Sequence, residues 1–240
     1  MLLTSTKNPV VQSAKALLTA KGRREQDAFL CDGEHMTGEA LRVCPEKVSA
    51  LFVEDGQQER FAPLLETISQ VKTPQGIAAV CGLPKPCPLE RQGQKLLLME
   101  NVQDPGNVGT ILRTLDAAGF DGCILTPGCA DPFAPKTMRA TMGSLFRVPM
   151  TFVENSAEAA RWLRTNGWAV IGAELRGQPF YQRGTRPDKL CVLIGNEGAG
   201  LTEEILAQCS FRYKLPMRGG AESLNAGIAA AVMMYDLMNR

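Results

Sequence analysis

Three segments in the C-terminal part of the chain carry polar side chains beside glycine and proline, in positions where chemistry could take place. Each segment follows a predicted strand and leads into a predicted helix. In α/β proteins, strand-end carbonyls and helix-start amides meet around a crevice at such loops, and ligands bind there. We therefore expect one composite site. Its candidate catalytic side chains are Asn107 and Arg113 in segment 101–113, Glu197 in segment 195–201, and Ser223 and Asn225 in segment 215–225.

The middle segment is rich in glycine, with Gly195, Gly198 and Gly200 in a Gly-x-x-Gly-x-Gly pattern. This spacing matches neither the dinucleotide fingerprint nor the phosphate loop that ends in Gly-Lys-Ser/Thr, so nucleotide hydrolysis has no support. Glycine allows close backbone approach and left-handed turns. The segment could therefore accept a flat, adenine-sized ligand, or it could simply form a tight turn between a strand and a helix.

Arg113 is the candidate for charge stabilisation, because a guanidinium can bind a phosphate and stabilise a developing alkoxide. It is a poor proton acceptor, since arginine almost never deprotonates, and it could instead form an ion pair with Asp104 or Glu197. The only histidine, His35, lies in the N-terminal part, which excludes a histidine base in the C-terminal part. We expect Asn107 to cap the helix that follows it. Ser223 and Asn225 are also residue types that cap helices, and they stand before a predicted apolar helix.

Alternating helices and strands must position these loops. In the N-terminal part we expect helices over 10–21, 34–43 and 61–68, and strands over 29–31, 48–53 and 77–81. In the C-terminal part we expect strands over 95–100, 122–126, 168–175, 190–195 and 211–215, and helices over 107–118, 155–167, after Thr202 and from about 223. The strands over 168–175 and 190–195 are too apolar to have a wet face, which predicts a parallel sheet covered on both sides.

Pro84, Pro86 and Pro88 favour a stiff, extended connection between the two parts. The predicted division is therefore a domain over 1–82, a linker over 83–94 and a domain over 95–240. The last predicted helix is apolar nearly all round, so we expect it to be buried in the core or against a second copy of the chain.

The composition describes an ordinary globular protein of 240 residues, 45% hydrophobic, with a net charge of +1. Its eight cysteines lack metal or redox spacing, which predicts reduced thiols, no metal site and a cytoplasmic location. No segment approaches the roughly 20 apolar residues that span a bilayer. Residues 1–24 contain five basic residues and no acidic ones, so they could contact phosphates or form a solvated face balanced by Glu25 and Asp27. These basic residues are Lys7, Lys15, Lys21, Arg23 and Arg24.

The three segments, taken in order, resemble the SpoU/TrmH family of RNA ribose 2′-O-methyltransferases, which belong to the SPOUT class. The match rests on Asp-Pro followed by Asn, Gly and Arg, then Gly-x-Glu-Gly-x-Gly, then Pro-Met followed by Ser-Leu-Asn. The resemblance implies a C-terminal parallel sheet with a trefoil knot, a small N-terminal α/β domain that binds substrate RNA, and a homodimer. It also implies S-adenosyl-L-methionine as the cofactor, held by Ile194, Gly195, Leu215, Met217 and Leu224.

The chain departs from the family pattern at one place, and the resemblance leaves the substrate open. The family commonly has Val or Ala and then Ser after Ser-Leu-Asn, whereas this chain has Ala226 and Gly227, which removes a hydroxyl. The N-terminal domain favours ribosomal RNA as the substrate, by analogy. A tRNA methyltransferase remains an alternative, as does a non-catalytic RNA-binding or ribosome-assembly protein on the same fold. A small-molecule methyltransferase is less favoured because of the basic segment 1–24.

Overall fold

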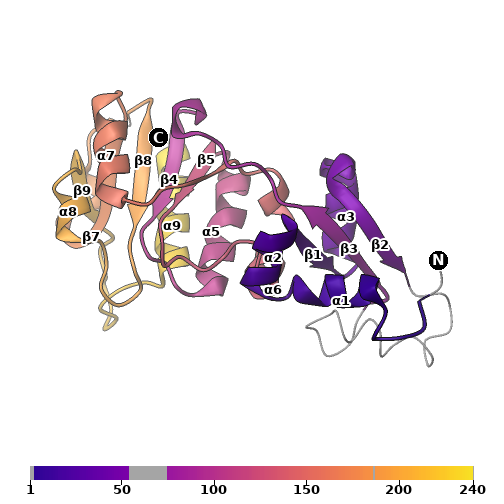
Figure 1. The fold of residues 1–240 in the computed structure, drawn as a ribbon. Coiled ribbons are helices and arrows are strands. Elements are labelled where there is room, and N and C mark those ends of the chain that lie inside the picture. The colour runs from indigo at the N-terminus through magenta and orange to yellow at the C-terminus, as the bar shows by residue number, and fades with distance from the viewer. Residues whose placement is uncertain (1–2, 54–74, 186, 240) are drawn as a thin grey trace. The chain divides into compact units, whose positions relative to one another are not determined.

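The computed structural model describes residues 3–185 and 187–239, except 54–74, and the predicted helix over 61–68 lies outside the described residues. The chain forms two compact units (Figure 1). The first consists of residues 1–85 and 131–147, and the second of residues 86–130 and 148–240. The predicted division differs from this one because segment 131–147, expected in the C-terminal domain, packs with the N-terminal residues.

The first unit is built on a three-stranded antiparallel sheet in the order β1-β3-β2. Its strands are β1 (Ala28–Asp32), β2 (Val48–Val53) and β3 (Ile77–Gly82). Its helices are α1 (Pro9–Ala16), α2 (Ala20–Gln26), α3 (Glu34–Val43) and α6 (Pro135–Thr141). The predicted helix over 10–21 was wrong in its extent, because the Thr19 side chain accepts a hydrogen bond from the amide of Gly22 and begins a second helix.

The second unit contains a six-stranded sheet in the order β6-β5-β4-β8-β7-β9, in which every neighbouring pair is parallel. This confirms the predicted parallel sheet. Its strands are β4 (Lys95–Met99), β5 (Gly122–Leu125), β6 (Met150–Phe152), β7 (Ala169–Pro179), β8 (Leu190–Ile194) and β9 (Phe211–Lys214). The strand order reverses between β4 and β8, where Met99 lies opposite Ile194. The loops that follow these two strands therefore meet at the position where α/β sheets bind ligands.

Helices of the second unit pack on the sheet and on one another. They are α5 (Pro105–Ala118), α7 (Ser156–Thr165), α8 (Glu203–Leu206) and α9 (Ala226–Asn239). Leu163 of α7 and Ile205 of α8 join a buried cluster that includes Leu96 and Leu193 of the sheet. Helices α5 and α9 pack against each other, and α9 also contacts β8 (Figure 1). In the part of the chain that the structure describes, no helix is long and apolar enough to cross a membrane.

The helix ends show which side chains cap the backbone. Gly119 ends α5 in the left-handed conformation, with φ of 68°, as predicted. Asp104 begins α5 by accepting a hydrogen bond from the amide of Asn107 at 2.8 Å, so the prediction that Asn107 caps this helix was wrong. Asn225 accepts hydrogen bonds from the first amides of α9, and that helix therefore begins at Ala226 rather than at Ser223.

Candidate cofactor and active site

The loops after β4 and β8 are joined by side-chain hydrogen bonds. The side-chain amide of Asn196 donates to the backbone carbonyl of Asn101 at 2.9 Å. The Glu197 carboxylate accepts from the backbone amides of Gln103 and Asp104 at 3.2 and 3.0 Å. The buried Asn107 side chain donates to the same carboxylate at 2.9 Å. The two sequence-predicted residues Asn107 and Glu197 therefore lie in direct contact, and Glu197 braces the start of α5.

These contacts also set the charge state of Glu197. Partial burial raises the pKa of this carboxyl, whereas the hydrogen bonds from Asn107, Asp104 and Gln103 lower it. The hydrogen bonds have the larger effect together, so the pKa lies below its usual value. Glu197 is therefore an ionised hydrogen-bond acceptor at neutral pH. It is suited to holding donors in place, and less suited to accepting a proton.

The glycine segment after β8 closes on itself. The amides of Asn196 and Gly200 each donate to the other residue's carbonyl, at 3.0 and 2.9 Å. A Cβ atom at Gly195 would lie 2.2 Å from the carbonyl carbon of Gly200, and Gly200 itself has φ of +72°. The tight-turn interpretation of the glycines is therefore correct for Gly195 and Gly200. It does not exclude ligand binding, because the same turn forms the wall of a cavity.

A cavity of about 670 Å³ opens beside this turn, between the ends of β7, β8 and β9 and the start of α9. This volume lies within the range of small-molecule sites. All five residues predicted to hold the cofactor line it, together with Glu197, Ser223 and Asn225. Leu215 is half-buried and Leu224 is 39% exposed, so neither belongs to the hydrophobic core.

Arg113 is placed differently from the other candidates. It lies on an exposed position of α5 and does not line the cavity. It forms no ion pair with Asp104 or Glu197, so that alternative was wrong. Its guanidinium is accordingly available to a substrate.

Gly227, where the chain departs from the family pattern, lies at the crossing of α9 and α5. A Cβ atom there would come within 3.2 Å of the Thr110 methyl group and of the Asn225 side-chain oxygen. The glycine therefore allows the two helices to approach closely, which explains its presence inside a helix despite its low helix propensity.

The sequence reasoning missed two residues that shape the site. Asn196 joins the two loops, and its side-chain oxygen also accepts hydrogen bonds from the amides of Gly198 and Ala199, both at 3.0 Å. Glu100 is buried behind the glycine segment and bonds to Thr202. Asn196 could have been identified by its position between Gly195 and Gly198 in the glycine segment. The signal for Glu100 was a carboxylate directly after an apolar strand.

Not all of the basic residues of segment 1–24 lie on the surface. Arg23 is only 4% exposed, and its guanidinium pairs with Asp131 at 2.6 Å and donates to the carbonyl of Leu17. The prediction that Arg23 contacts RNA was therefore wrong, because its charge is already neutralised in the interior. Lys21 lies 3.7 Å from Glu25, and the remaining three side chains are exposed, namely Lys7, Lys15 and Arg24.

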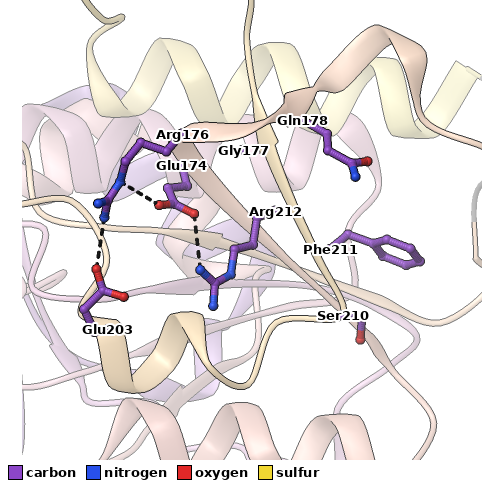
Figure 2. A pocket seen from close by; sticks show the side chains of 8 residues that line it. All are labelled: Glu174, Arg176, Gly177, Gln178, Glu203, Ser210, Phe211 and Arg212. Atoms are coloured by element: carbon purple, nitrogen blue, oxygen red, sulfur yellow. Dashed lines mark hydrogen bonds and ion pairs between the residues drawn. The ribbon is translucent and has the colours of Figure 1, made fainter.

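A second hollow of about 490 Å³ lies along β7 and β9 and shares Glu174 and Arg176 with the first (Figure 2). Arg176 pairs with Glu203 at 3.0 Å and with Glu174 at 3.3 Å, and Arg212 lies 3.8 Å from Glu174. Figure 2 shows these four side chains converging, while Phe211 and Gln178 point away from them. The charges within this hollow are balanced. Across the described residues, no group of three or more His, Cys, Asp or Glu side chains could hold a metal ion.

Solved structures of methyltransferases share this fold. The AdoMet-bound rRNA methyltransferase from Sinorhizobium meliloti is 31% identical, with a TM-score of 0.86 over 98% of this chain and 96% of that one. The SpoU methyltransferase AviRb from Streptomyces viridochromogenes, in complex with AdoMet, is 27% identical, with a TM-score of 0.83 over 97% of each chain. The fold and the site thus define an α/β methyltransferase.

The particular family follows from the sequence. The model of the SpoU rRNA Methylase family matches residues 94–235, and the chain belongs to this family. A relative in Bacillus subtilis, the 23S rRNA (guanosine(2553)-2′-O)-methyltransferase RlmP, is 37% identical over 98% of both chains. The predicted resemblance to the SpoU/TrmH family is confirmed.

Proposed function

We propose that this protein transfers a methyl group from S-adenosyl-L-methionine to a ribose 2′-hydroxyl of ribosomal RNA. The observation that carries the proposal is the cavity at the ends of β8 and β9, beside the Glu197–Asn107 contact at the start of α5. The B. subtilis relative, matched over nearly its whole length, is named for this reaction on 23S rRNA.

The cavity has the chemical character that such a cofactor needs. Apolar side chains of Ile194, Leu215 and Met217 lie beside the backbone of the glycine segment, which offers close approach to a flat ring. When bound, the cofactor supplies an electrophilic methyl group on a positively charged sulfur. The ribose 2′-hydroxyl would take up this methyl group, and its proton would pass to solvent water.

Arg113 is proposed as the residue that binds the RNA phosphate and stabilises negative charge on the reacting oxygen. Its exposure on α5 and its lack of an ion pair with Asp104 or Glu197 support this role. Asn107 and Glu197 would hold the loops, while Ser223 and Asn225 lie at the cavity wall, where they can orient the ribose.

The exposed basic residues Lys7, Lys15 and Arg24 are proposed to contact the RNA backbone. Ribosomal RNA as the substrate would also place the protein in the cytoplasm. The tRNA alternative and the non-catalytic alternative have no specific support among the contacts described above.

A homodimer and a trefoil knot remain proposals. In the apolar helix α9, Ile228 is 49% exposed and Tyr235 is 47% exposed. These residues lie two helical turns apart on one face, which a second copy could cover.

The knot proposal rests on the path of the chain after edge strand β9. The chain returns to α9, which packs against both α5 and β8. The Arg183–Asp236 ion pair joins α9 to the connection between β7 and β8. A path of this kind is compatible with a threaded loop.

The proposal is tested with methyl-labelled S-adenosylmethionine and separate pools of unmodified rRNA and tRNA, followed by alkaline digestion, which cannot cleave beside a 2′-O-methylated ribose. Label in alkali-resistant dinucleotides from rRNA is expected.

Because transition-state charge stabilisation is worth about 10²–10³ in rate, Arg113→Ala should lower kcat by that factor. Lys136→Ala, which removes an exposed positive charge on α6, should leave kcat unchanged. Label from tRNA alone would favour the alternative substrate, and cofactor binding without transfer to either pool or to ribosomal particles would favour the non-catalytic reading.

A further inference from the structure

Glu100 is a buried carboxylate that the chemistry described so far does not use. It directly follows β4, is 6% exposed, and accepts three hydrogen bonds. The donors are the Thr202 amide at 2.8 Å, the Thr202 hydroxyl at 2.9 Å and the Ser156 hydroxyl at 2.5 Å. A carboxylate is costly to bury unless donors surround it, so these three bonds fix its position tightly.

The position of these donors links Glu100 to the cofactor cavity. Thr202 directly follows Leu201, the last residue of the glycine segment that lines the cavity, and it caps α8. The Glu100 amide also donates to the carbonyl of Ile194, at the other end of the same segment, at 2.8 Å. Glu100 therefore holds both ends of the segment. Its backbone amide bonds to Ile194 at the N-terminal end, and its carboxylate bonds to Thr202 at the C-terminal end.

The remaining ties on this segment are less protected. Asn196 and Glu197 hold its middle, and the Glu197 carboxylate is exposed to solvent, where water competes for its donors. Glu100 itself does not line the cavity. Any effect that it has on a ligand must therefore pass through the backbone of residues 195–202.

We propose that Glu100 is a positioning residue that fixes the cofactor-binding segment 195–202 through its bonds to Thr202. The proposal rests on the proposed function only in taking the cavity at the ends of β7, β8 and β9 as the cofactor site. Without the negative charge, the Thr202 amide has a weaker or repelling hydrogen-bond partner, and the C-terminal end of the segment becomes less ordered. Ligand binding must then order this end, which lowers the net binding free energy.

The test is Glu100→Gln in the full chain, with cofactor binding measured by calorimetry using S-adenosylmethionine and, separately, S-adenosylhomocysteine. Both dissociation constants are expected to rise by about tenfold or more, which corresponds to about 1.4 kcal/mol per factor of ten. Because Glu100 does not touch the reacting atoms, kcat at saturating cofactor should change far less than KM for the cofactor.

Ser156→Ala is the matched control, because it removes a hydrogen bond to the same carboxylate but from α7 rather than from the cofactor segment. It should raise both dissociation constants far less than Glu100→Gln does, because both bonds from Thr202 to Glu100 remain. Equal weakening in the two variants, or wild-type affinity in a folded Glu100→Gln protein, would overturn the proposal. If Glu100→Gln does not fold, Thr202→Val is the second variant. It keeps the amide donor but removes the hydroxyl that donates to Glu100 and accepts from the Ile205 amide at the start of α8. Wild-type affinity in that variant would count equally against the proposal. Failure of the wild-type protein to bind either ligand would instead refute the proposed function.

Discussion

Gly195→Ala is expected to weaken cofactor binding while leaving the rest of the sheet folded. The new Cβ would lie 2.2 Å from the carbonyl carbon of Gly200 and 2.4 Å from the amide nitrogen of Leu201, and both are backbone atoms that cannot rotate away. The turn must open, which breaks the two hydrogen bonds between Asn196 and Gly200. At about 0.5–1.5 kcal/mol each, the loss is about 1–3 kcal/mol. That range corresponds to roughly 5- to 150-fold weaker binding.

Gly198→Ala is the control for this experiment. The added Cβ at this position would meet only the Asn196 side-chain oxygen, at an ordinary contact distance of 3.7 Å. Calorimetry with S-adenosylmethionine should show wild-type affinity for Gly198→Ala and a large loss for Gly195→Ala, and thermal unfolding should show that both are folded. Wild-type affinity in Gly195→Ala, or an equal loss in both variants, would refute the reasoning that closure of this turn forms the binding wall.

Two further predictions concern the first unit. Arg23→Ala should destabilise it by about 1.5–3 kcal/mol, because it removes a buried guanidinium that bonds to the partly exposed Asp131 and to the Leu17 carbonyl. Lys15→Ala should leave thermal stability unchanged, and it should lower the slope of log binding constant against log salt concentration for RNA by about one. Equal stability of the two variants would contradict the buried role of Arg23. Hydrogen bonds from Arg42 and Arg147 lower the pKa of Glu39 from 4.5 to about 2. The stability that this carboxylate adds is therefore complete above pH 4.5 and is lost as the pH falls toward 2. The difference in melting temperature between wild type and Glu39→Gln should accordingly be large at pH 6 and vanish near pH 2, and a difference that does not change with pH would show that the ion pairs do not cause it.

Local sequence signals predicted most of the fold of the second unit. Apolar runs and glycine or capping residues marked strands such as β8, the C-terminal end of α5 and the start of α7, because these features depend on neighbouring residues alone. β6 and α6 were missed, since β6 has only three residues and α6 begins within a stretch of turn-forming residues. Their formation depends on packing rather than on local pattern.

The candidate site was predictable to a similar degree. The three segments and their order located the cavity, because loops at the ends of parallel strands share one edge. The partner of each side chain was not predictable. Asp104 rather than Asn107 caps α5, and Asn107 instead bonds to Glu197, ninety residues along the chain. Arg23 looked like its exposed neighbours until its long-range partner Asp131 was placed beside it. Such pairings are set by tertiary structure.

Segment 131–147 leaves the second unit and returns to it, so the polypeptide passes between the units three times, after residues 85, 130 and 147. A fragment cut at the proline-rich connection, such as residues 95–240, would retain Phe133 without the Phe29 ring that lies 5.1 Å from it. It would also keep Arg147 without Glu39. The N-terminal module is therefore not a detachable appendage. Loss of the N-terminal residues by a single recombination event would leave segment 131–147 without its packing partners, with apolar side chains such as Phe133 exposed. The two units are therefore expected to be inherited together.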